Sequence, residues 1–120
     1  MSSSLLGLRT AIYAAPNLDQ VKAWYAAFLG IDPYFDEPFY VGFNVGGYEL
    51  GLDPDTAPAS GTPVTYWGVT DLAATWQQLL DLGATAQQEP QDVGDGIIVA
   101  TVTDPFGNTL GIIQNPYVKG

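Results

Sequence analysis

The sequence predicts an α+β fold of two βαβββ modules, in which the strands form a cupped mixed sheet and the helices cover its outer faces. The order of one strand, one helix and three strands occurs twice in the 120 residues. Residues 15–18 correspond to residues 69–72, and LGL at 50–52 corresponds to LGI at 110–112. A chain of this length with 47% apolar residues forms one core and is too short for two ordinary domains. We therefore expect a single domain, with module one at about 8–53, a linker at 54–63 and module two at 64–116.

The first module opens with a strand, because residues 8–15 carry β-branched and aromatic side chains. Apolar residues then recur at three- and four-residue spacings from Val21 to Leu29, which predicts a helix. Asn17 with Gln20 resembles a capping box at its start, and Gly30 suits its end. Three extended segments follow, at 32–35, 39–45 and 48–53, with Gly46 and Gly47 as a hairpin turn.

The second module repeats this order after a segment rich in Pro, Ala and Ser. Residues 64–69 predict a strand, and Thr70 or Asp71 caps a helix that ends at Gly83. The remaining extended segments are expected near 85–89, 96–103 and 109–114.

Composition excludes several classes of partner. Thirteen acidic residues against three basic ones give a formal charge of −10, which disfavours binding to nucleic acid or to an anionic membrane. No apolar run approaches the length that spans a bilayer, and the N-terminus lacks the pattern of a signal peptide. With no Cys, disulfides and thiol chemistry are excluded. A cytoplasmic protein is the resulting expectation.

One segment near the C-terminus, DPFGNTLGII at 104–113, links the sequence to a known family. Turn chemistry explains its Asp, Pro, Gly and Asn locally. Together with NLDQVKAWYAAFLGID and VTDLAATWQQLLDLGA, however, it resembles the vicinal oxygen chelate superfamily over about residues 8–116. That group includes glyoxalase I, extradiol dioxygenases, fosfomycin-resistance enzymes and bleomycin-binding proteins.

The resemblance implies four positions for metal ligands, at which the family's metal enzymes carry His, Gln or Glu. In this sequence they fall on Thr10, Val64 and Gly111, and on either Glu49 or Gly51. The chain contains no His, so at most one of these positions offers a strong ligand. We therefore expect no metal and no other cofactor.

Strand alternation identifies the residues that share the cupped face with these positions. The candidate ligand-binding residues are Thr10, Ile12, Phe43, Glu49, Gly51, Asp53, Val64, Tyr66, Gly111 and Ile113. Tyr66, with Phe43 or Tyr40, would supply a stacking surface, and the two carboxylates would supply negative charge. The glycines in the strands would widen a cavity, but they would equally allow two modules or two subunits to pack closely. Each aromatic residue, taken singly, is also typical of a hydrophobic core. Glu49 is the hardest to assign to structure alone, because a carboxylate in an apolar cup needs a partner.

Two functions of different class remain, and binding is favoured over catalysis. In the first, the protein sequesters a small organic molecule, cationic or aromatic, without a metal, as bleomycin-resistance proteins do. In the second, it is a lyase, isomerase or dioxygenase-type enzyme of the superfamily that uses Glu49 as acid or base. A module for assembly without a ligand is a third possibility. Open sheet edges and an open cup also predict a homodimer.

Overall fold

The computed structural model describes residues 9–55 and 65–116, and the order of its elements confirms two βαβββ modules. Module one contains β1 (Thr10–Ala14), α1 (Leu18–Leu29), β2 (Phe35–Glu37), β3 (Tyr40–Val45) and β4 (Tyr48–Asp53). Module two contains β5 (Thr65–Gly68), α2 (Leu72–Asp81), β6 (Thr85–Asp92), β7 (Ile98–Thr103) and β8 (Thr109–Gln114). Most of the expected linker, and Val64 with it, lies outside the described residues.

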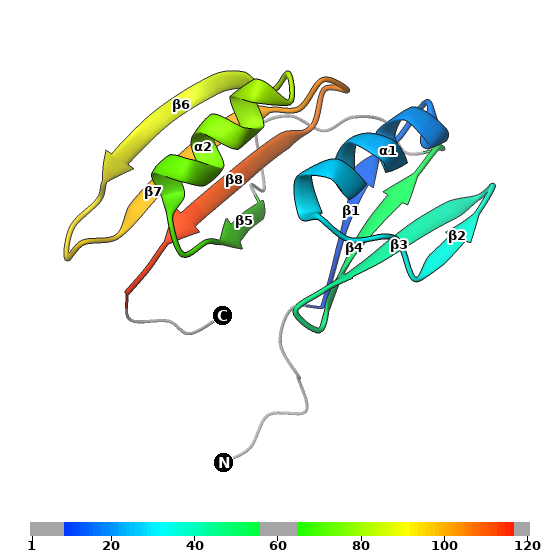
Figure 1. The fold of residues 1–120 in the computed structure, drawn as a ribbon, viewed down its shortest axis with the longest axis horizontal. Coiled ribbons are helices and arrows are strands. Elements are labelled where there is room, and N and C mark those ends of the chain that lie inside the picture. The colour runs from blue at the N-terminus through cyan, green and yellow to red at the C-terminus, as the bar shows by residue number, and fades with distance from the viewer. Residues whose placement is uncertain (1–8, 56–64, 117–120) are drawn as a thin grey trace, which may run out of the picture.

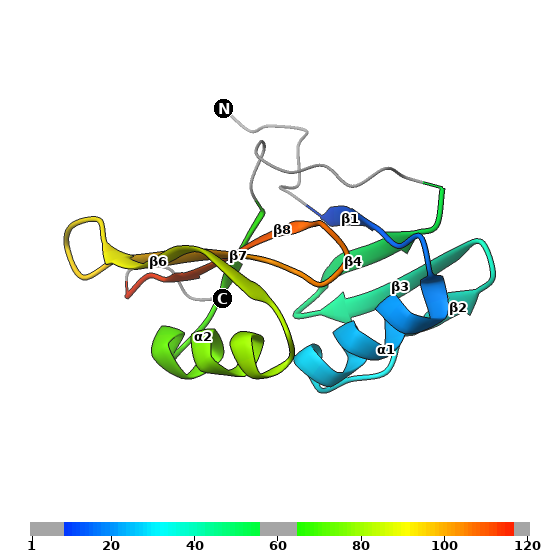
Figure 2. The ribbon, with the colours of Figure 1, turned by 90° about the horizontal axis from the view of Figure 1, so that it is seen from above.

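Each module forms its own four-stranded mixed sheet. The strand orders are β1-β4-β3-β2 and β5-β8-β7-β6. The first strand of each module therefore lies at one edge of its sheet and pairs in parallel with the last strand. Both helices lie on the same side of the sheets (Figures 1 and 2). The opposite side of each sheet carries no helix, and we call it the open face.

The helices begin and end where local chemistry predicts. The Asn17 side chain accepts a hydrogen bond from the Gln20 N–H at 3.4 Å, and Gly30 closes α1 in the left-handed conformation at φ 72°. Of the two candidates for the second cap, Asp71 is the one used, since its carboxylate accepts from the Ala74 N–H at 3.1 Å. No helix among the described residues is long and apolar enough to cross a membrane.

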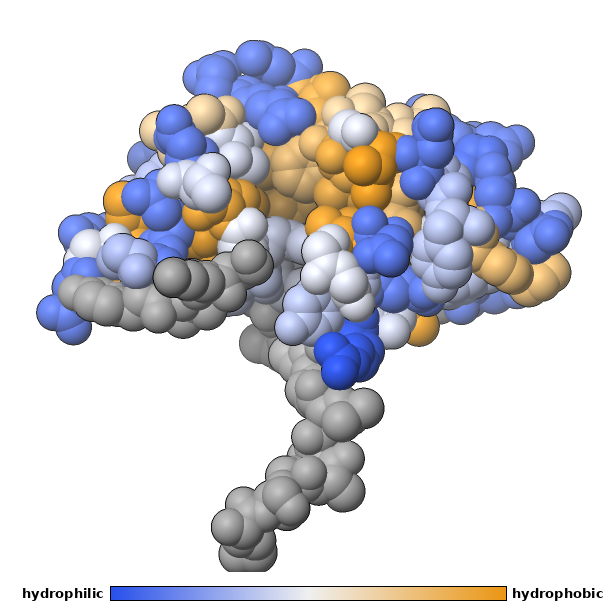
Figure 3. All heavy atoms as spheres, turned by 60° about the horizontal axis from the view of Figure 1, so that its bottom comes forward, coloured by the Kyte–Doolittle hydropathy of each residue, from blue (hydrophilic) through white to orange (hydrophobic). Residues whose placement is uncertain are grey.

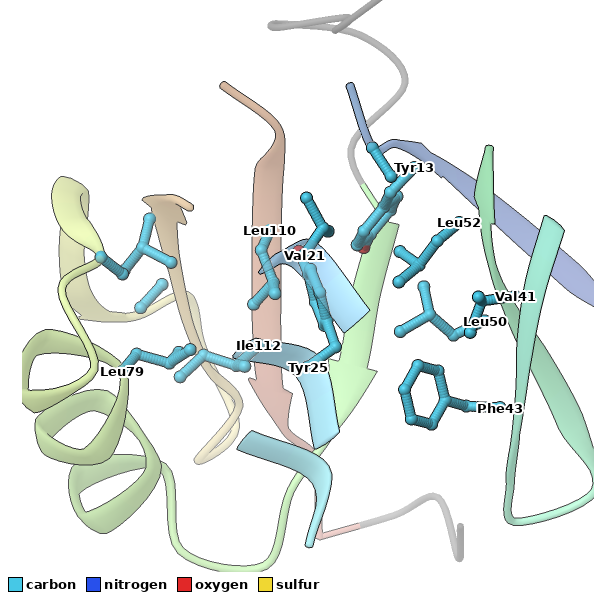
Figure 4. Close-up of a cluster of buried hydrophobic side chains, with 14 of the residues drawn as sticks. Tyr13, Val21, Tyr25, Val41, Phe43, Leu50, Leu52, Leu79, Leu110 and Ile112 are labelled. Carbon is cyan, nitrogen blue, oxygen red and sulfur yellow. The ribbon is translucent and has the colours of Figure 1, made fainter. Parts of the chain in front are cut away.

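A single hydrophobic core joins the two modules. Val21 and Tyr25 of α1 lie between the core strands of module one and those of module two (Figure 4). On one side they meet Leu50 of β4, and on the other Leu110 of β8, all fully or almost fully buried. Side chains of α1 therefore belong to the core that both modules share.

The DPFGN turn connects module two to module one. Asp104, which is 3% exposed, accepts hydrogen bonds from the Phe106 and Asn108 N–H groups at 2.9 and 2.8 Å. Its second oxygen accepts from the Tyr25 hydroxyl at 2.6 Å. The Asn108 amide bonds to both the N–H and the carbonyl of Ala14, at 3.1 and 2.9 Å. The motif is therefore a buried clamp between the modules as well as a turn.

Two strands depart from the expected boundaries. The first extended segment after α1 was expected at 32–35, but β2 runs through Phe35–Glu37 because these residues pair with β3. In module two, β6 extends to Asp92, beyond the expected end at 89, and its pairing with β7 contains irregularities around Gln88.

Candidate functional site

The open face of module one carries several of the predicted site residues. Thr10 and Ile12 of β1 lie opposite Glu49 and Gly51 of β4 in the parallel register. Their neighbours on β4, Leu50 and Leu52, point into the core and are fully buried. Glu49 is half-buried and Ile12 is 53% exposed, so this face of the sheet is accessible.

Glu49 forms the polar centre of this face. Its two carboxylate oxygens accept hydrogen bonds from different tyrosines, Oε1 from the Tyr34 hydroxyl and Oε2 from the Tyr40 hydroxyl. Tyr34 is held in place because its backbone N–H donates to the Gly42 carbonyl at 3.0 Å, which extends the pairing of β2 with β3. Two elements, β3 and the segment before β2, thus direct phenol groups onto one carboxylate of β4.

Glycines make room for these rings. A Cβ atom at Gly51 would lie 2.0 Å from the Tyr40 hydroxyl oxygen, and one at Gly42 would lie 3.3 Å from Tyr34 Cε1 and 3.4 Å from Glu49 Cδ. Gly42 and Gly51 are direct partners across β3 and β4. Any larger residue at Gly51 would displace the Tyr40 ring from the sheet. Aromatic rings therefore fill the space beside Gly42 and Gly51, and the two glycines do not leave an open cavity.

Both tyrosines remain protonated donors at neutral pH. Burial, and then the hydrogen bond to Glu49, raise the pKa of Tyr40 well above its usual value. For the exposed Tyr34, the hydrogen bond to Glu49 is the main cause of a raised pKa. The phenol groups consequently stay neutral, and the negative charge of the cluster resides on the carboxylate.

Further aromatic side chains surround this cluster at the β2 edge. The rings of Phe35 and Phe39 have centroids 6.0 Å apart at an interplanar angle of 65°, and those of Phe35 and Tyr40 are 6.1 Å apart at 56°. Phe39 and Tyr34 are 66% and 65% exposed. Sequence reasoning did not select Tyr34, Phe35 or Phe39, although four aromatic residues in the segment 34–40 were a visible signal.

The open face of module two is built on the same plan around Tyr66, Gly111 and Ile113. Tyr66 lies opposite Gly111 in the register of β5 and β8, and a Cβ at Gly111 would be 2.7 Å from Tyr66 Cδ1. Ile113 is half-buried two residues further along β8. Thr109 is 7% exposed, and among the described residues its hydroxyl is a buried side-chain group without a hydrogen-bond partner.

Two predicted site residues lie elsewhere. Phe43 faces the helices, opposite Leu50, and is fully buried in the core, so it does not line the open face. Asp53 shares the face of Glu49 but lies four residues along β4, about 13 Å away for an extended strand. Its carboxylate accepts from the Asp55 N–H at 2.8 Å, as in a turn. The two carboxylates therefore do not act on one small group.

The residues at the positions implied for a metal do not fit one. Thr10 offers a hydroxyl, Gly51 and Gly111 offer no side chain, and Glu49 is already bound by two tyrosines. Val64, outside the described residues, has no donor atom in its side chain. Within residues 9–55 and 65–116, no three His, Cys, Asp or Glu side chains lie together as a metal site requires.

Among the described residues, the surface carries a separate cleft and an apolar region. A cleft of about 620 Å³ lies between the start of α1 and the turn after β2, lined by charged residues such as Asp19, Asp36 and Glu37, and contains none of the predicted site residues. Asp36 there pairs with Lys22 at 3.1 Å. Figure 3 shows apolar surface gathered near the middle of the face it displays, with hydrophilic residues to either side.

The sequence is similar to a known superfamily and to a bacterial protein. The model of the glyoxalase/bleomycin resistance protein/dioxygenase superfamily matches residues 7–112. The uncharacterized protein YurT of Bacillus subtilis is 32% identical over 78 residues, which make up 57% of this chain and 61% of that protein. The chain thus matches less than two thirds of the length of this relative.

Solved structures share the fold at low identity. A putative glyoxalase family protein from Bacillus anthracis has a TM-score of 0.76 and 20% identity, covering 96% of this chain and 99% of that one. The bleomycin resistance determinant encoded on the transposon Tn5 has a TM-score of 0.71 and 23% identity, and the match covers 92% of this chain and 98% of that one. Lactoylglutathione lyase from Agrobacterium tumefaciens has a TM-score of 0.73 and 16% identity, and the match covers 92% of this chain and 95% of that one. A resistance determinant and a lyase therefore both have this architecture.

Proposed function

This chain belongs to the glyoxalase/bleomycin resistance protein/dioxygenase superfamily, and we propose that it binds a small cationic aromatic molecule without a metal. The observation that carries the proposal is the Glu49 carboxylate, which lies on the open face of module one among the rings of Tyr34 and Tyr40. A negative charge beside aromatic surface is the arrangement that recognises organic cations. The formal charge of −10 favours the approach of such a molecule from solution.

The hydrogen bonds of Glu49 favour binding over base catalysis. Each oxygen accepts one tyrosine hydroxyl, and the carboxylate keeps its negative charge. If Glu49 accepted a proton from a substrate, it would lose its negative charge, and a neutral carboxyl group accepts hydrogen bonds more weakly. Proton abstraction would therefore weaken the hydrogen bonds to Tyr34 and Tyr40, whereas binding of a cation leaves the charge in place.

Metal independence is part of the proposal and rests on the donor atoms at the implied positions. A glyoxalase-type or dioxygenase-type reaction needs several protein ligands to a Lewis acid or redox metal. Of the residues at the implied ligand positions, Glu49 alone has a carboxylate, and the others include Thr10, Gly51 and Gly111. Elemental analysis of the purified protein should find no metal ion bound one to one. A stoichiometric metal that is lost in the Glu49→Ala variant would contradict this part.

Thermal-shift and calorimetric titrations test the binding function. The probes are cationic aromatics and size-matched aromatic carboxylates, applied to the wild type and to Glu49→Gln. We expect the cations to bind more tightly, and Glu49→Gln to weaken them about tenfold, because it removes about 1–2 kcal/mol of charge interaction near the surface. Glu89→Gln on the exposed β6 strand makes the same change in net charge far from the site and should leave binding unchanged. Stronger binding of the carboxylates would refute the proposal.

We further propose that two copies of the chain associate. Ile12 and Tyr66, on the open faces of the two modules, are 53% and 43% exposed, which leaves apolar surface for a second subunit to cover. Symmetric pairs are the commonest soluble oligomers. Light scattering at tens of micromolar protein should give twice the chain mass of 12.8 kDa, and a monomer mass would exclude this association.

Acid–base catalysis is the second candidate function, and the contact between Glu49 and two phenol groups is the observation in its favour. A tyrosine hydroxyl that turns from Glu49 to the substrate is able to donate its one hydrogen bond to a developing oxyanion while Glu49 moves a proton. Turnover of a carbonyl substrate by the metal-free protein, abolished in Glu49→Gln and retained in Glu89→Gln, would establish it.

A further inference from the structure

The aromatic residues near Glu49 form a partly exposed group of rings that face different directions. We define the module-one enclosure as Tyr34, Phe35, Phe39 and Tyr40, with the Glu49 carboxylate beside Tyr34 and Tyr40. The Phe35 ring packs against Phe39 at 65° and against Tyr40 at 56°, with centroids 6.0 and 6.1 Å apart, so these rings are in contact but do not stack face to face. Because two of the four side chains are about two-thirds exposed, ring faces remain free for a ligand.

The enclosure is held by specific contacts of the sheet. The Tyr40 ring lies directly over Gly51, and the Tyr34 ring lies over Gly42 beside the Glu49 carboxyl group. Both hydroxyl groups donate to Glu49, which fixes the orientation of the two rings. Aromatic rings that served only to fill space would not need a shared acceptor on a neighbouring strand.

The state of Glu49 then decides which cation suits the site. Its charge remains, but each of its oxygens has already accepted one hydrogen bond. The nearby walls are aromatic faces, which attract positive charge and accept hydrogen bonds only weakly. A primary ammonium group carries three N–H donors, and a guanidinium carries five, so either would lose water from donors that find few acceptors here. A fully alkylated ammonium has no N–H to satisfy.

We propose that the module-one enclosure selects a fully N-alkylated ammonium group over primary ammonium and guanidinium groups. This inference rests on the proposed function, since it names the chemical class of the cation that binds. The positive charge of such a group is spread over its methyl or methylene hydrogens, which contact ring faces directly. Glu49 contributes long-range attraction and keeps its two tyrosine partners in place.

An NMR titration with three probes of one size class tests the selection. The probes are benzyltrimethylammonium, benzylammonium and benzylguanidinium, added to uniformly ¹⁵N-labelled protein. The amide signals of Gly42 and Gly51 report on the enclosure, because these residues lie beneath the Tyr34 and Tyr40 rings. The amides of Gly94 and Gly107, in loops of module two, serve as distant references. We expect benzyltrimethylammonium to bind at least about fivefold more tightly than the other two.

Three variants separate the walls from the charge. Phe39→Leu removes an exposed ring that does not contact Glu49 and should weaken benzyltrimethylammonium severalfold. Tyr48→Leu removes a ring of similar exposure, 51%, on the opposite side of β4 and should have no effect. Tyr34→Phe keeps the ring but frees one oxygen of Glu49 to accept an N–H group. The affinity for benzylammonium should therefore move closer to the affinity for benzyltrimethylammonium.

The outcomes distinguish this inference from the proposed function. Tighter binding of benzylammonium or benzylguanidinium, with shifts at Gly42 and Gly51, would overturn the selection and leave cation binding in place. If none of the three cations shifts these amides, the binding function itself is refuted. If the same amides shift on dilution without any probe, a second copy of the chain covers the enclosure, and the selection is again overturned.

Discussion

Removal of one hydroxyl group from the core should reveal how much the DPFGN clamp contributes to stability. Tyr25 is 1% exposed and donates to Asp104 at 2.6 Å, across the boundary between the modules. Asp104 is equally buried, and three further hydrogen bonds reach its carboxylate, from the Phe106 N–H and from both the N–H and the side-chain amide of Asn108. Tyr25→Phe deletes one of these four bonds and leaves the ring packing intact.

The expected loss follows from the charge of the acceptor. A hydrogen bond to a charged group contributes about 1.5–3 kcal/mol, roughly twice the contribution of a neutral one. The other three donors keep Asp104 partly satisfied, so the full penalty for an unpaired buried charge does not apply. We therefore expect Tyr25→Phe to lower the free energy of unfolding by about 2 kcal/mol, which corresponds to about 8 °C in Tm for a domain of this size.

Tyr13 provides the matched control. It is also buried, at 6% exposure, and its hydroxyl also bonds across the modules, but its partner is the neutral Trp67 indole N–H at 2.9 Å. Tyr13→Phe should cost only about 1 kcal/mol. Urea denaturation followed by tryptophan fluorescence measures both variants. If Tyr25→Phe loses no more stability than Tyr13→Phe, the buried carboxylate is not the centre of the clamp.

Three other changes have defined outcomes. Gly111→Ala places a Cβ 2.9 Å from the Thr65 carbonyl oxygen and should lower Tm markedly, whereas Gly68→Ala on the same sheet meets nothing within 4 Å and should be tolerated. Thr109→Val removes the unpartnered hydroxyl and should raise the free energy of unfolding by about 1 kcal/mol in urea titrations, and a loss of stability would show that the hydroxyl is bonded. Burial raises the pKa of Tyr25 well above 10, so the contribution of Tyr25 to stability should be constant below pH 10. Stability should fall as the pH rises beyond 10, less steeply in Tyr25→Phe.

Local signals account for how far the fold was predictable. Helix starts at Asn17 and Asp71 depend on side chains that bond within three residues, and such contacts are visible in sequence. The internal repeat predicted the order of helices and strands along the chain, because two segments of similar sequence adopt the same order of elements. The end of β2 was placed incorrectly since its pairing with β3 decides it, and pairing is not local.

The placement of Phe43 was predictable in principle and was missed. A two-residue turn at Gly46 and Gly47 pairs Val45 with Tyr48, and therefore Phe43 with Leu50. Paired residues share a face, and Leu50 alternates with Glu49, so Phe43 had to point away from the carboxylate. Tyr34 was harder to find, because the contact of its hydroxyl with Glu49 depends on the course of the chain between α1 and β2.

The clamp and the open face lie in different parts of the molecule. Asp104 and Asn108 connect the modules from within the buried interior, whereas Glu49, Gly51 and Gly111 lie on the sides that carry no helix. On the proposed function, we therefore expect substitutions on the open face to change what the protein binds, while the clamp preserves the arrangement of the modules. This separation explains why the DPFGN motif identifies the superfamily and leaves the activity undetermined. It also means that Glu49→Gln and Tyr25→Phe should affect different measurements, the first binding and the second stability.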